Sequence, residues 1–314
     1  MTTRFAYLLL FSAAICSLIG SLTKGSTSLS LYQLMFAENG QFHPIFLHLR
    51  LPRTLAAFVS GSLLALAGSL MQLLLQNPLA DPYVLGISSG AALFALISMS
   101  LGLGESSLIG SAWLGSLFTM IGIFMLAKKH RFNTHTLLLS GIALACGFSA
   151  CISLVLLIST NTEVHSMLFW LTGHLNGVRF PWLALVILLG GFTICCLLAP
   201  GLNILSRGEQ EARALGLPSK HYRIAIYLLS SLFTAAAVTL SGCIGFIGLI
   251  VPHLTRMLIG YDHRVLLPLS ALLGGSLMTF ADTCARSLFA PAEIPVGIVM
   301  AILGVPLFIW LLQK

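Results

Sequence analysis

The sequence predicts an all-α membrane protein that crosses the bilayer about ten times. Of its 314 residues, 57% are hydrophobic and only 8% are charged, and the mean hydropathy is +0.98. Soluble domains carry about 25% charged residues. Apolar segments of about the 20 residues that span a bilayer recur along the whole chain. These observations exclude a separately folded soluble domain, and we expect residues 1–314 to form a single transmembrane domain.

The chain contains ten candidate spans. The first combines a basic residue, an apolar run and small residues, which are features of a cleaved signal peptide. The apolar segments that follow it favour an uncleaved first span instead. The eighth is the shortest of the ten. In order, the spans lie at residues 5–22, 53–75, 83–103, 107–127, 136–158, 180–200, 222–242, 244–259, 264–284 and 296–312.

Small residues lie along several of these segments. They include Gly61 and Gly68 in the second segment, residues 86–92 in the third, and Gly274 and Gly275 in the ninth. Small residues let helices approach closely in lipid, where no hydrophobic force drives them together. We therefore interpret most of them as packing positions.

The eighth segment is interrupted. Residues 245–256 read GFIGLIVPHLTR, which places two glycines, a proline and a histidine in an apolar run. Glycine and proline weaken a helix, and a freed backbone group in lipid must find a partner within the protein or at a water-filled cavity. A broken segment of this kind indicates the wall of a transport path. A kinked packing helix accounts equally well for these residues taken alone.

Positive charge is divided unevenly between the two sides. With the N-terminus in the cytoplasm, eleven Lys and Arg residues fall on the cytoplasmic side and five on the outer side, as the positive-inside rule requires. The formal charge of +7 is therefore a matter of orientation and does not indicate nucleic-acid binding. The outer five are Lys24, Arg50, Arg53, Arg179 and Arg286. The cytoplasmic eleven are Arg4, Lys128, Lys129, Arg131, Arg207, Arg213, Lys220, Arg223, Arg256, Arg264 and Lys314.

Ten spans divide into two groups of five, and an odd number per group inverts the second group relative to the first. Inverted repeats are a common transporter architecture. Residues 53–68 and 223–242 share an apolar, small-residue pattern that ends in glycine. We therefore expect inverted five-helix repeats.

Cofactor and metal chemistry find little support in the sequence. The seven cysteines all fall in apolar segments without metal-ligand spacing, so they are interpreted as small buried residues. His130 and His135 lie beside a basic loop without an acidic partner on one helix face, which is unlike a zinc site. The phosphate-binding pattern GxxxxGK[ST] does not occur. We expect no cofactor, no metal, no catalytic residue and no ATP hydrolysis by a P-loop of this chain.

One motif suggests an intramembrane hydrolase. Residues 86–90 read GISSG, which matches the G-x-S-x-G nucleophile elbow, and His253 could serve as a base. That elbow requires a strand, a turn and a helix, and the predicted context lacks the strand. We therefore treat the hydrolase as a minor alternative.

The longest polar loop on the cytoplasmic side lies at residues 205–218, LSRGEQEARALGLP. Ser206 and Glu209 have capping-box spacing for a short helix, and Gly216 and Pro218 would end it. A short capped helix with charges of both signs and an apolar end suits docking to a soluble partner. A solvated connecting loop fits the same residues.

Several motifs together resemble the FecCD-type family of permeases for iron-siderophores, haem and cobalamin. The resemblance covers roughly residues 45–312. Glu211 and Ala212 followed by Gly216 are similar to the E-A-A…G coupling loop of ABC importer permeases, with Arg213 in place of the second alanine. The other stretches are LRLPRTL at 49–55, QNPLADP at 76–82, GFIGLIVPHLTR at 245–256, DHRVLLP at 262–268, ADTCAR at 281–286 and AEIPVG at 292–297.

The resemblance implies a permease domain within a type II ABC importer in the bacterial inner membrane. Two permease copies, expected here as a homodimer, would form a central path, and both termini would be cytoplasmic. Two ATP-binding subunits would drive transport, and a periplasmic or surface binding protein would deliver the metal chelate. No nucleic acid is expected. The family's substrates share these motifs, so the sequence does not single one out.

The resemblance also implies three sets of site residues. Arg50, Arg53 and Arg286 match the positions that dock the binding protein, although arginines that anchor the membrane interface would look the same. The cytoplasmic gate corresponds to Asn77, Leu79, Thr134 and His135, where His135 replaces a small polar residue. The coupling residues are Ser206, Glu209, Glu211, Ala212, Arg213, Leu215 and Gly216.

The mechanism that we predict is alternating access driven by the partner ATPases through residues 206–218. The alternative is a secondary transporter powered by an ion gradient, which would need ionisable groups within the membrane. Asp282, Arg286 and His253 are the few candidates for such groups.

Overall fold

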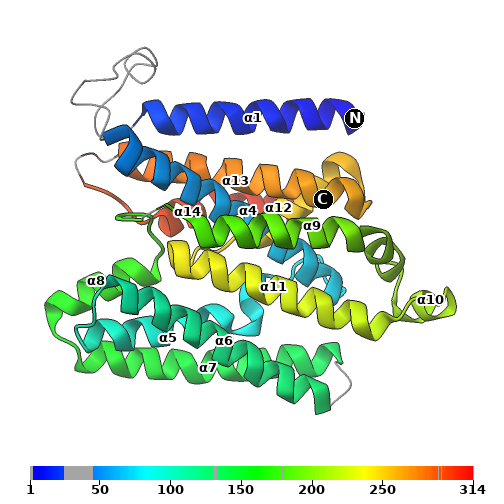
Figure 1. Ribbon diagram of the computed structural model, residues 1–314, viewed down its shortest axis with the longest axis horizontal. Helices are drawn as coiled ribbons and strands as arrows, with labels where there is room; N and C mark the ends of the chain where they lie inside the picture. The colour runs from blue at the N-terminus through cyan, green and yellow to red at the C-terminus, as the bar shows by residue number, and fades with distance from the viewer. Residues whose placement is uncertain are drawn as a thin grey trace.

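The protein consists of helices that run side by side (Figure 1). The computed structural model describes residues 3–24, 45–129, 133–178, 180–288, 290 and 292–313, and this part of the chain contains no strand. Ten helices correspond to the predicted spans: α1 (Thr3–Thr23), α4 (Leu51–Leu74), α5 (Ile87–Ser100), α6 (Glu105–Lys129), α7 (Thr134–Ile158), α9 (Trp182–Leu205), α11 (Ser219–Ser241), α12 (Ile247–Ile259), α13 (His263–Ser287) and α14 (Val296–Leu312).

Four shorter elements connect these helices. A π-helical turn, η1 (Phe46–Arg50), leads into α4, and a 3-10 turn, η2 (Pro82–Leu85), precedes α5. The helix α8 (Asn161–Leu171) follows α7, and α10 (Glu209–Ala214) lies between α9 and α11. In Figure 1 the N-terminus and α10 lie at one end of the bundle and α8 at the other. We call these the α10 end and the α8 end.

The predicted all-α membrane class is confirmed. Within the described residues, six helices are long and apolar enough to cross a membrane, and four shorter apolar helices accompany them at Tyr7–Thr23, Ile87–Ser100, Ile247–Ile259 and Val296–Leu311. The third and sixth spans differ most from their predictions: Pro82–Leu85 form a separate turn, so that α5 begins only at Ile87, and α9 continues to Leu205. The helix α8 was not predicted. Thr160 and Glu163 form a capping box at its start.

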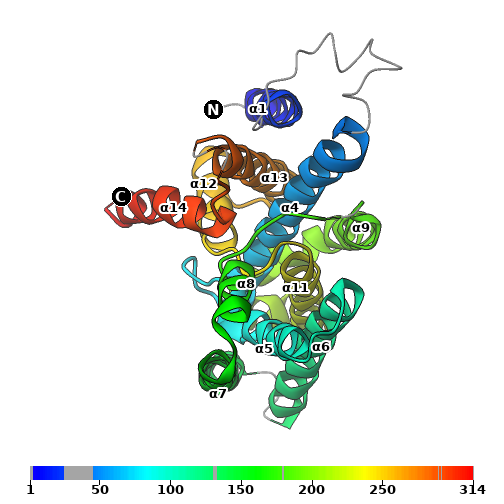
Figure 2. The same ribbon diagram turned by 90° about the vertical axis from the view of Figure 1, so that its left-hand side faces the viewer.

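The centre of the bundle is α4, as the view along the helices shows (Figure 2). Its most apolar stretch is 89% buried within the chain, whereas that of α7 is only 11% buried. Side chains of α4 pack on α9, α11, α12 and α13. The outer helix α7 therefore exposes most of its apolar surface, and α14 exposes several large apolar side chains, among them Ile302 at 67%.

The packing partners of four helices in each predicted five-helix half follow the same pattern. In these halves α4, α5, α6 and α7 correspond to α11, α12, α13 and α14. The helix α4 packs on α12 and α13, and its counterpart α11 packs on α5 and α6. Likewise α7 packs on α5 and α6, while α14 packs on α12 and α13.

Close helix approaches depend on glycine in α4. A Cβ atom added to Gly61 would collide with the backbone oxygen of Gly274 in α13. One added to Gly68 would collide with the backbone of Gly248 in α12. The interpretation of these glycines as packing positions is therefore correct at the centre of the bundle.

The helices α5 and α12, which correspond to each other in the two halves, are short, and each begins after an unwound segment. The helices α5 and α12 have 14 and 13 residues, and each follows a residue with positive φ, Gly86 at 70° and Phe246 at 72°. A positive φ is unusual for an aromatic residue and is maintained only when the surrounding structure enforces it. Short, interrupted helices at matching places in two halves mark the transport path in membrane carriers.

Candidate functional sites along the bundle

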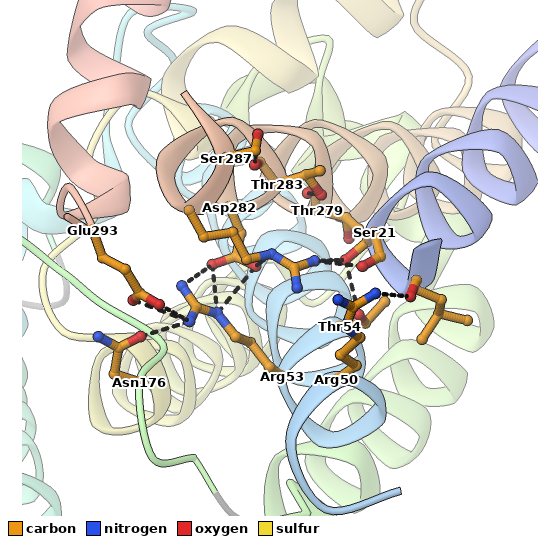
Figure 3. Close-up of polar contacts among 12 residues, drawn as sticks. Ser21, Arg50, Arg53, Thr54, Asn176, Thr279, Asp282, Thr283, Ser287 and Glu293 are labelled. Atoms are coloured by element: carbon orange, nitrogen blue, oxygen red, sulfur yellow. Dashed lines mark hydrogen bonds and ion pairs between the residues drawn. The ribbon is translucent and has the colours of Figure 1, made fainter. Parts of the chain in front are cut away.

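An arginine–carboxylate cluster occupies the α8 end (Figure 3). Arg53 in α4 is its centre. Its guanidinium bonds Asp282 of α13, with Nη2 2.9 Å and Nε 3.0 Å from Oδ1. Its Nη1 donates to Asn176 Oδ1 at 2.6 Å and to Glu293 Oε2 at 3.2 Å. Arg53 therefore joins α4, α13 and two loops that are distant in sequence.

The other two predicted docking arginines contact α1. Arg50 Nη1 donates to the carbonyls of Leu22 at 2.8 Å and Thr23 at 3.0 Å. Arg286 Nη2 donates to the carbonyl and the hydroxyl of Ser21, both at 2.6 Å. The last carbonyls of a helix lack partners within it and carry partial negative charge, so arginine satisfies both requirements.

The structure brings the three predicted arginines together, with different exposures. Arg50 and Arg286 are each 6% exposed, whereas the Arg53 side chain is 14% and that of its partner Glu293 36% exposed. Arg286 Nε lies 3.4 Å from Asp282 Oδ2, and Asp282 is fully buried. Arg53 and Arg286 thus pair with the carboxylates of Asp282 and Glu293, and together with Arg50 the cluster has a formal net charge of one positive unit.

Sequence reasoning did not identify the carboxylates as partners of these arginines. Asp282 was considered only as a site for ion coupling, and Glu293 only as part of a motif. A signal was present, because Asp282 lies one helical turn before Arg286 at the same end of a span. The pairing with Arg53, 229 residues away in sequence, has no local signal.

The two unwound segments meet inside the bundle. The hydroxyl of Tyr83 in η2 donates to the carbonyl of Ile244 at 3.0 Å and accepts from its amide at 2.9 Å. A Cβ on Gly248 would lie 2.6 Å from the ring of Pro82. A phenol thus satisfies backbone groups that unwinding has freed, as irregular backbone in a membrane requires.

A second polar contact fixes α12 to α4. Gln72 of α4 donates to the carbonyls of Gly248 at 3.3 Å and Leu249 at 3.1 Å. Its side-chain oxygen accepts from Arg256 Nη2, two helical turns further along α12. One buried glutamine therefore contacts both the start and the end of the broken helix.

Two of the predicted gate residues lie in the loop after α4. The Asn77 side chain accepts from the Leu79 amide at 2.9 Å, which closes a tight turn. This turn leaves Leu79 43% exposed. Leu79 borders a small, largely apolar cavity between this loop, α12 and α14. The cavity is lined by Pro78, Leu79, Leu249, His253, Phe308 and Leu311.

The other two predicted gate residues are the first two of α7, and they do not line this cavity. Asn133 caps the helix by accepting from the His135 amide at 3.1 Å. The Thr134 hydroxyl accepts from Arg223 Nη2 of α11 at 2.9 Å. The described structure therefore divides the four predicted gate residues between two places.

The predicted start of the coupling helix is wrong in detail. Ser206 does not cap α10, because α9 continues to Leu205 and the Ser206 hydroxyl donates back to Asn203 at 2.8 Å. Gly208, with φ of 112°, occupies the position before α10. Glu209 instead forms ion pairs with Arg213 at 2.5 Å and Arg223 at 2.8 Å.

The predicted end of the coupling helix is correct. Gly216 has φ of 78°. Its amide donates to the Arg213 carbonyl at 3.0 Å, and the Leu217 amide donates to the Ala212 carbonyl at 2.9 Å. This is the Schellman arrangement, in which a left-handed glycine ends a helix.

The faces of α10 differ in exposure. Ala212 is fully buried, whereas Leu215 is 62% exposed, and Glu211 is also exposed. The helix packs on α9 and α11. One face of α10 is thus anchored in the bundle, and Glu211 and the following Leu215 are exposed at its surface.

Asp262, between α12 and α13, forms a hydrogen-bonded cluster with Asn203 of α9. The Asp262 carboxylate accepts from the Asn203 amide at 2.6 Å and from the Arg264 backbone amide at 3.0 Å. These two hydrogen bonds, the Asn203 contact foremost, lower the pKa of Asp262. Asn203 Oδ1 also accepts from the His263 amide at 2.8 Å. The end of α9 is thereby joined to the start of α13.

The serine motif has no hydrolase context. Gly86 and Ser88 lie at the start of α5, which follows a 3-10 turn, and the Ser89 hydroxyl donates to the Gly86 carbonyl at 2.8 Å. No strand occurs in the residues that the structure describes. Among these same residues, no group of three His, Cys, Asp or Glu side chains could hold a metal ion.

Comparison with known sequences yields closely related transport proteins. A family model described as the FecCD transport family matches residues 8–314. The chain is 42% identical to the hemin transport system permease protein HmuU of Yersinia pestis over 308 residues, 94% of this chain and 91% of that protein. It is 41% identical to the vitamin B12 import system permease protein BtuC of Escherichia coli O127:H6 over 271 residues, 85% and 82% of the two chains.

Comparison with solved structures agrees with the sequence comparison. A structure described as an inward-facing conformation of a metal-chelate type ABC transporter superposes with a TM-score of 0.90 at 35% identity, over 100% of both chains. PsaBC from Streptococcus pneumoniae superposes with a TM-score of 0.58 at 18% identity, over 83% of this chain and 89% of that one, which shows the fold alone.

Proposed function

The chain belongs to the FecCD transport family, and on this premise we propose that it is the permease subunit of a type II ABC importer. Its substrate is a metal chelate of the iron-siderophore, haem or cobalamin class. The chain itself is not an enzyme, and ATP is hydrolysed by two separate ATP-binding subunits. The protein lies in the bacterial inner membrane with both termini in the cytoplasm.

The observation that carries this proposal is the position of α10 relative to the interrupted helices. This helix lies at one end of the bundle, anchored by buried Ala212 and exposing Leu215. The unwound segments before α5 and α12 lie in the interior and meet at Tyr83. Broken helices at matching places line the transport path in membrane carriers, and an exposed helix at the end of the bundle gives an ATP-binding subunit a surface on which to dock.

We assign the α8 end to the substrate-binding protein. Arg53, Glu293 and Asn176 form the part of the arginine cluster that a partner can reach, since Glu293 is 36% exposed. Arg50 and Arg286, which are buried against α1, hold that surface in place and contribute positive charge. The cluster retains one net positive charge, which suits acidic lobes on the partner.

The gate lies at the cavity beside Leu79. A second copy of the permease covers the surface of α7 and α14, which lie on the same side of the bundle in Figure 2. Leu79 and His253 then face the path between the two copies, and Asn77 holds the gate loop by its contact with the Leu79 amide. Thr134 and His135 act on the gate from the start of α7.

An ion-coupled secondary transporter is not favoured. Asp282, its best candidate residue, is fully buried but lies between Arg53 and Arg286. A carboxylate compensated by two arginines is poorly suited to bind and release a coupling cation.

The proposal is tested by assembly. The purified permease in nanodiscs is mixed with the ATP-binding subunit, and the ATPase rate is measured with and without chelate-loaded binding protein. We expect a stable complex whose ATPase rate responds to the loaded binding protein. A permease that never binds an ATP-binding subunit would contradict the proposal.

A further inference from the structure

Arg223 lies between the coupling helix and the start of α7. It occupies the second turn of α11, and its side chain is only 12% exposed. One arm of its guanidinium, Nη1, lies 2.8 Å from Glu209 Oε2 in α10. The other, Nη2, donates to the Thr134 hydroxyl of α7 at 2.9 Å. Arg223 of α11 thus contacts both α10 and α7, which are not consecutive along the chain.

The contact with α10 is charge-assisted. A guanidinium–carboxylate hydrogen bond is shorter and stronger than a neutral one, and Glu209, whose side chain is 38% exposed, also pairs with Arg213 of α10. Glu209 is the first residue of α10, and buried Ala212 anchors the same short helix. A shift of α10 therefore carries the carboxylate that Arg223 contacts.

The contact with α7 reaches the long helix that is least buried within its own chain. Of the six long apolar helices in the described structure, α7 is the least buried, at 11% of its most apolar stretch. It also contacts the turn after the gate loop, because a Cβ on Gly141 would lie 2.6 Å from the Val84 carbonyl oxygen. A displaced α7 therefore presses on η2, which follows Leu79 and Asp81 directly.

We propose that Arg223 is a positioning residue that transmits the movement of α10 to α7 and through η2 to the gate. This inference rests on the proposed function as an ATP-driven permease. The three contacts in sequence are Glu209 to Arg223, Arg223 to Thr134, and Gly141 to Val84. Arginine suits this position because its planar fork makes two directed hydrogen bonds at once.

The test uses substitutions that cut one contact while keeping shape. Thr134→Val removes the acceptor hydroxyl at nearly constant volume, and Thr134→Ser retains it. Arg223→Gln removes the charge and one arm, and Lys220→Gln removes an exposed charge one turn earlier in α11. Each variant is reconstituted in liposomes with the ATP-binding subunit and the binding protein. The readout is the amount of chelate imported per ATP hydrolysed.

We expect Thr134→Val and Arg223→Gln each to lower this ratio by about tenfold, which corresponds to about 1.4 kcal/mol of lost coupling. Thr134→Ser and Lys220→Gln should each import as much chelate per ATP as the parent. Because both substitutions break one pathway, the double variant should be no worse than the more severe single variant.

Three results would overturn the inference. Thr134→Val could import as much chelate per ATP as the parent, Thr134→Ser could be as defective as Thr134→Val, or the two losses could simply add. In each case the parent still shows ATP-dependent import, so the proposed function stands and only the role of Arg223 fails. A parent complex without any ATP-dependent import would overturn both.

Discussion

The buried carboxylate at the α8 end provides a quantitative test of the arginine cluster. Replacing Asp282 with Asn keeps its shape and removes its charge, which leaves Arg53 and Arg286 facing each other. Asp282 is fully buried, and the two arginine side chains are 14% and 7% exposed. Removing one partner of a buried ion pair costs about 3–5 kcal/mol. Arg53 keeps Glu293 and Asn176, so we expect a loss of about 3 kcal/mol, at the lower end of this range.

The free energy of unfolding is measured in mixed micelles by titration with a denaturing detergent, with helical circular dichroism as the signal. Thr283→Val is the matched control, because the Thr283 hydroxyl donates only one helical turn back, to Thr279 at 2.8 Å. Loss of such a bond costs about 1 kcal/mol. If Asp282→Asn is no less stable than Thr283→Val, the cluster does not hold α1, α4 and α13 together as inferred.

Four further predictions concern the two ends of the bundle. Leu79→Ala should raise the leak of chelate through sealed vesicles, because a methyl group fills the gate less than an isobutyl group does; an unchanged leak would place the constriction elsewhere. Glu211→Lys should lower import per ATP while the permease still inserts, because it reverses an exposed charge of α10; normal import would make residues 206–218 a mere connector. Arg53→Gln should weaken the binding protein about thirtyfold or more at low salt, from the 2–5 kcal/mol cost of truncating a charge pair; equal affinity would remove the docking role. The pKa of Asp262 is lowered, so the stabilisation by its charge is complete above the usual pKa of about 4 and is lost as the pH falls through the lowered value. The difference in melting temperature between the parent and Asp262→Leu should therefore stay constant from about pH 5 to 8 and shrink below about pH 4. A change in this difference near pH 7 would contradict the prediction.

Hydropathy and charge were sufficient to predict the membrane class and the order of the spans. Lipid requires each spanning segment to satisfy its own backbone, so helices are expected wherever apolar runs are long enough. The interruption before α12 was also predictable from Gly245 and Gly248. That its left-handed residue would be Phe246 was not predictable, because surrounding contacts hold this unfavourable conformation.

The positions of the site residues were predicted better than their contacts. The motif at residues 281–286 contained both Asp282 and Arg286, but the partner of Asp282 in α4 lies 229 residues away. Similarly, Arg223 was counted only as a cytoplasmic charge, since its contact with Thr134 spans 89 residues of sequence. The start of α10 was misplaced because Ser206 and Glu209 have the right spacing for a cap. In the structure α9 continues to Leu205, and Ser206 is the residue that ends α9.

The central claim is that ATP hydrolysis by partner subunits, and no ion gradient, drives a metal chelate through this permease. It is tested most directly by uptake of a radiolabelled metal chelate into liposomes that contain the permease and its ATP-binding subunit, with loaded binding protein outside. We predict accumulation that requires ATP on the side of α10 and that persists when ionophores collapse proton and sodium gradients. Uptake that proceeds without ATP and stops on addition of the ionophores would contradict the claim.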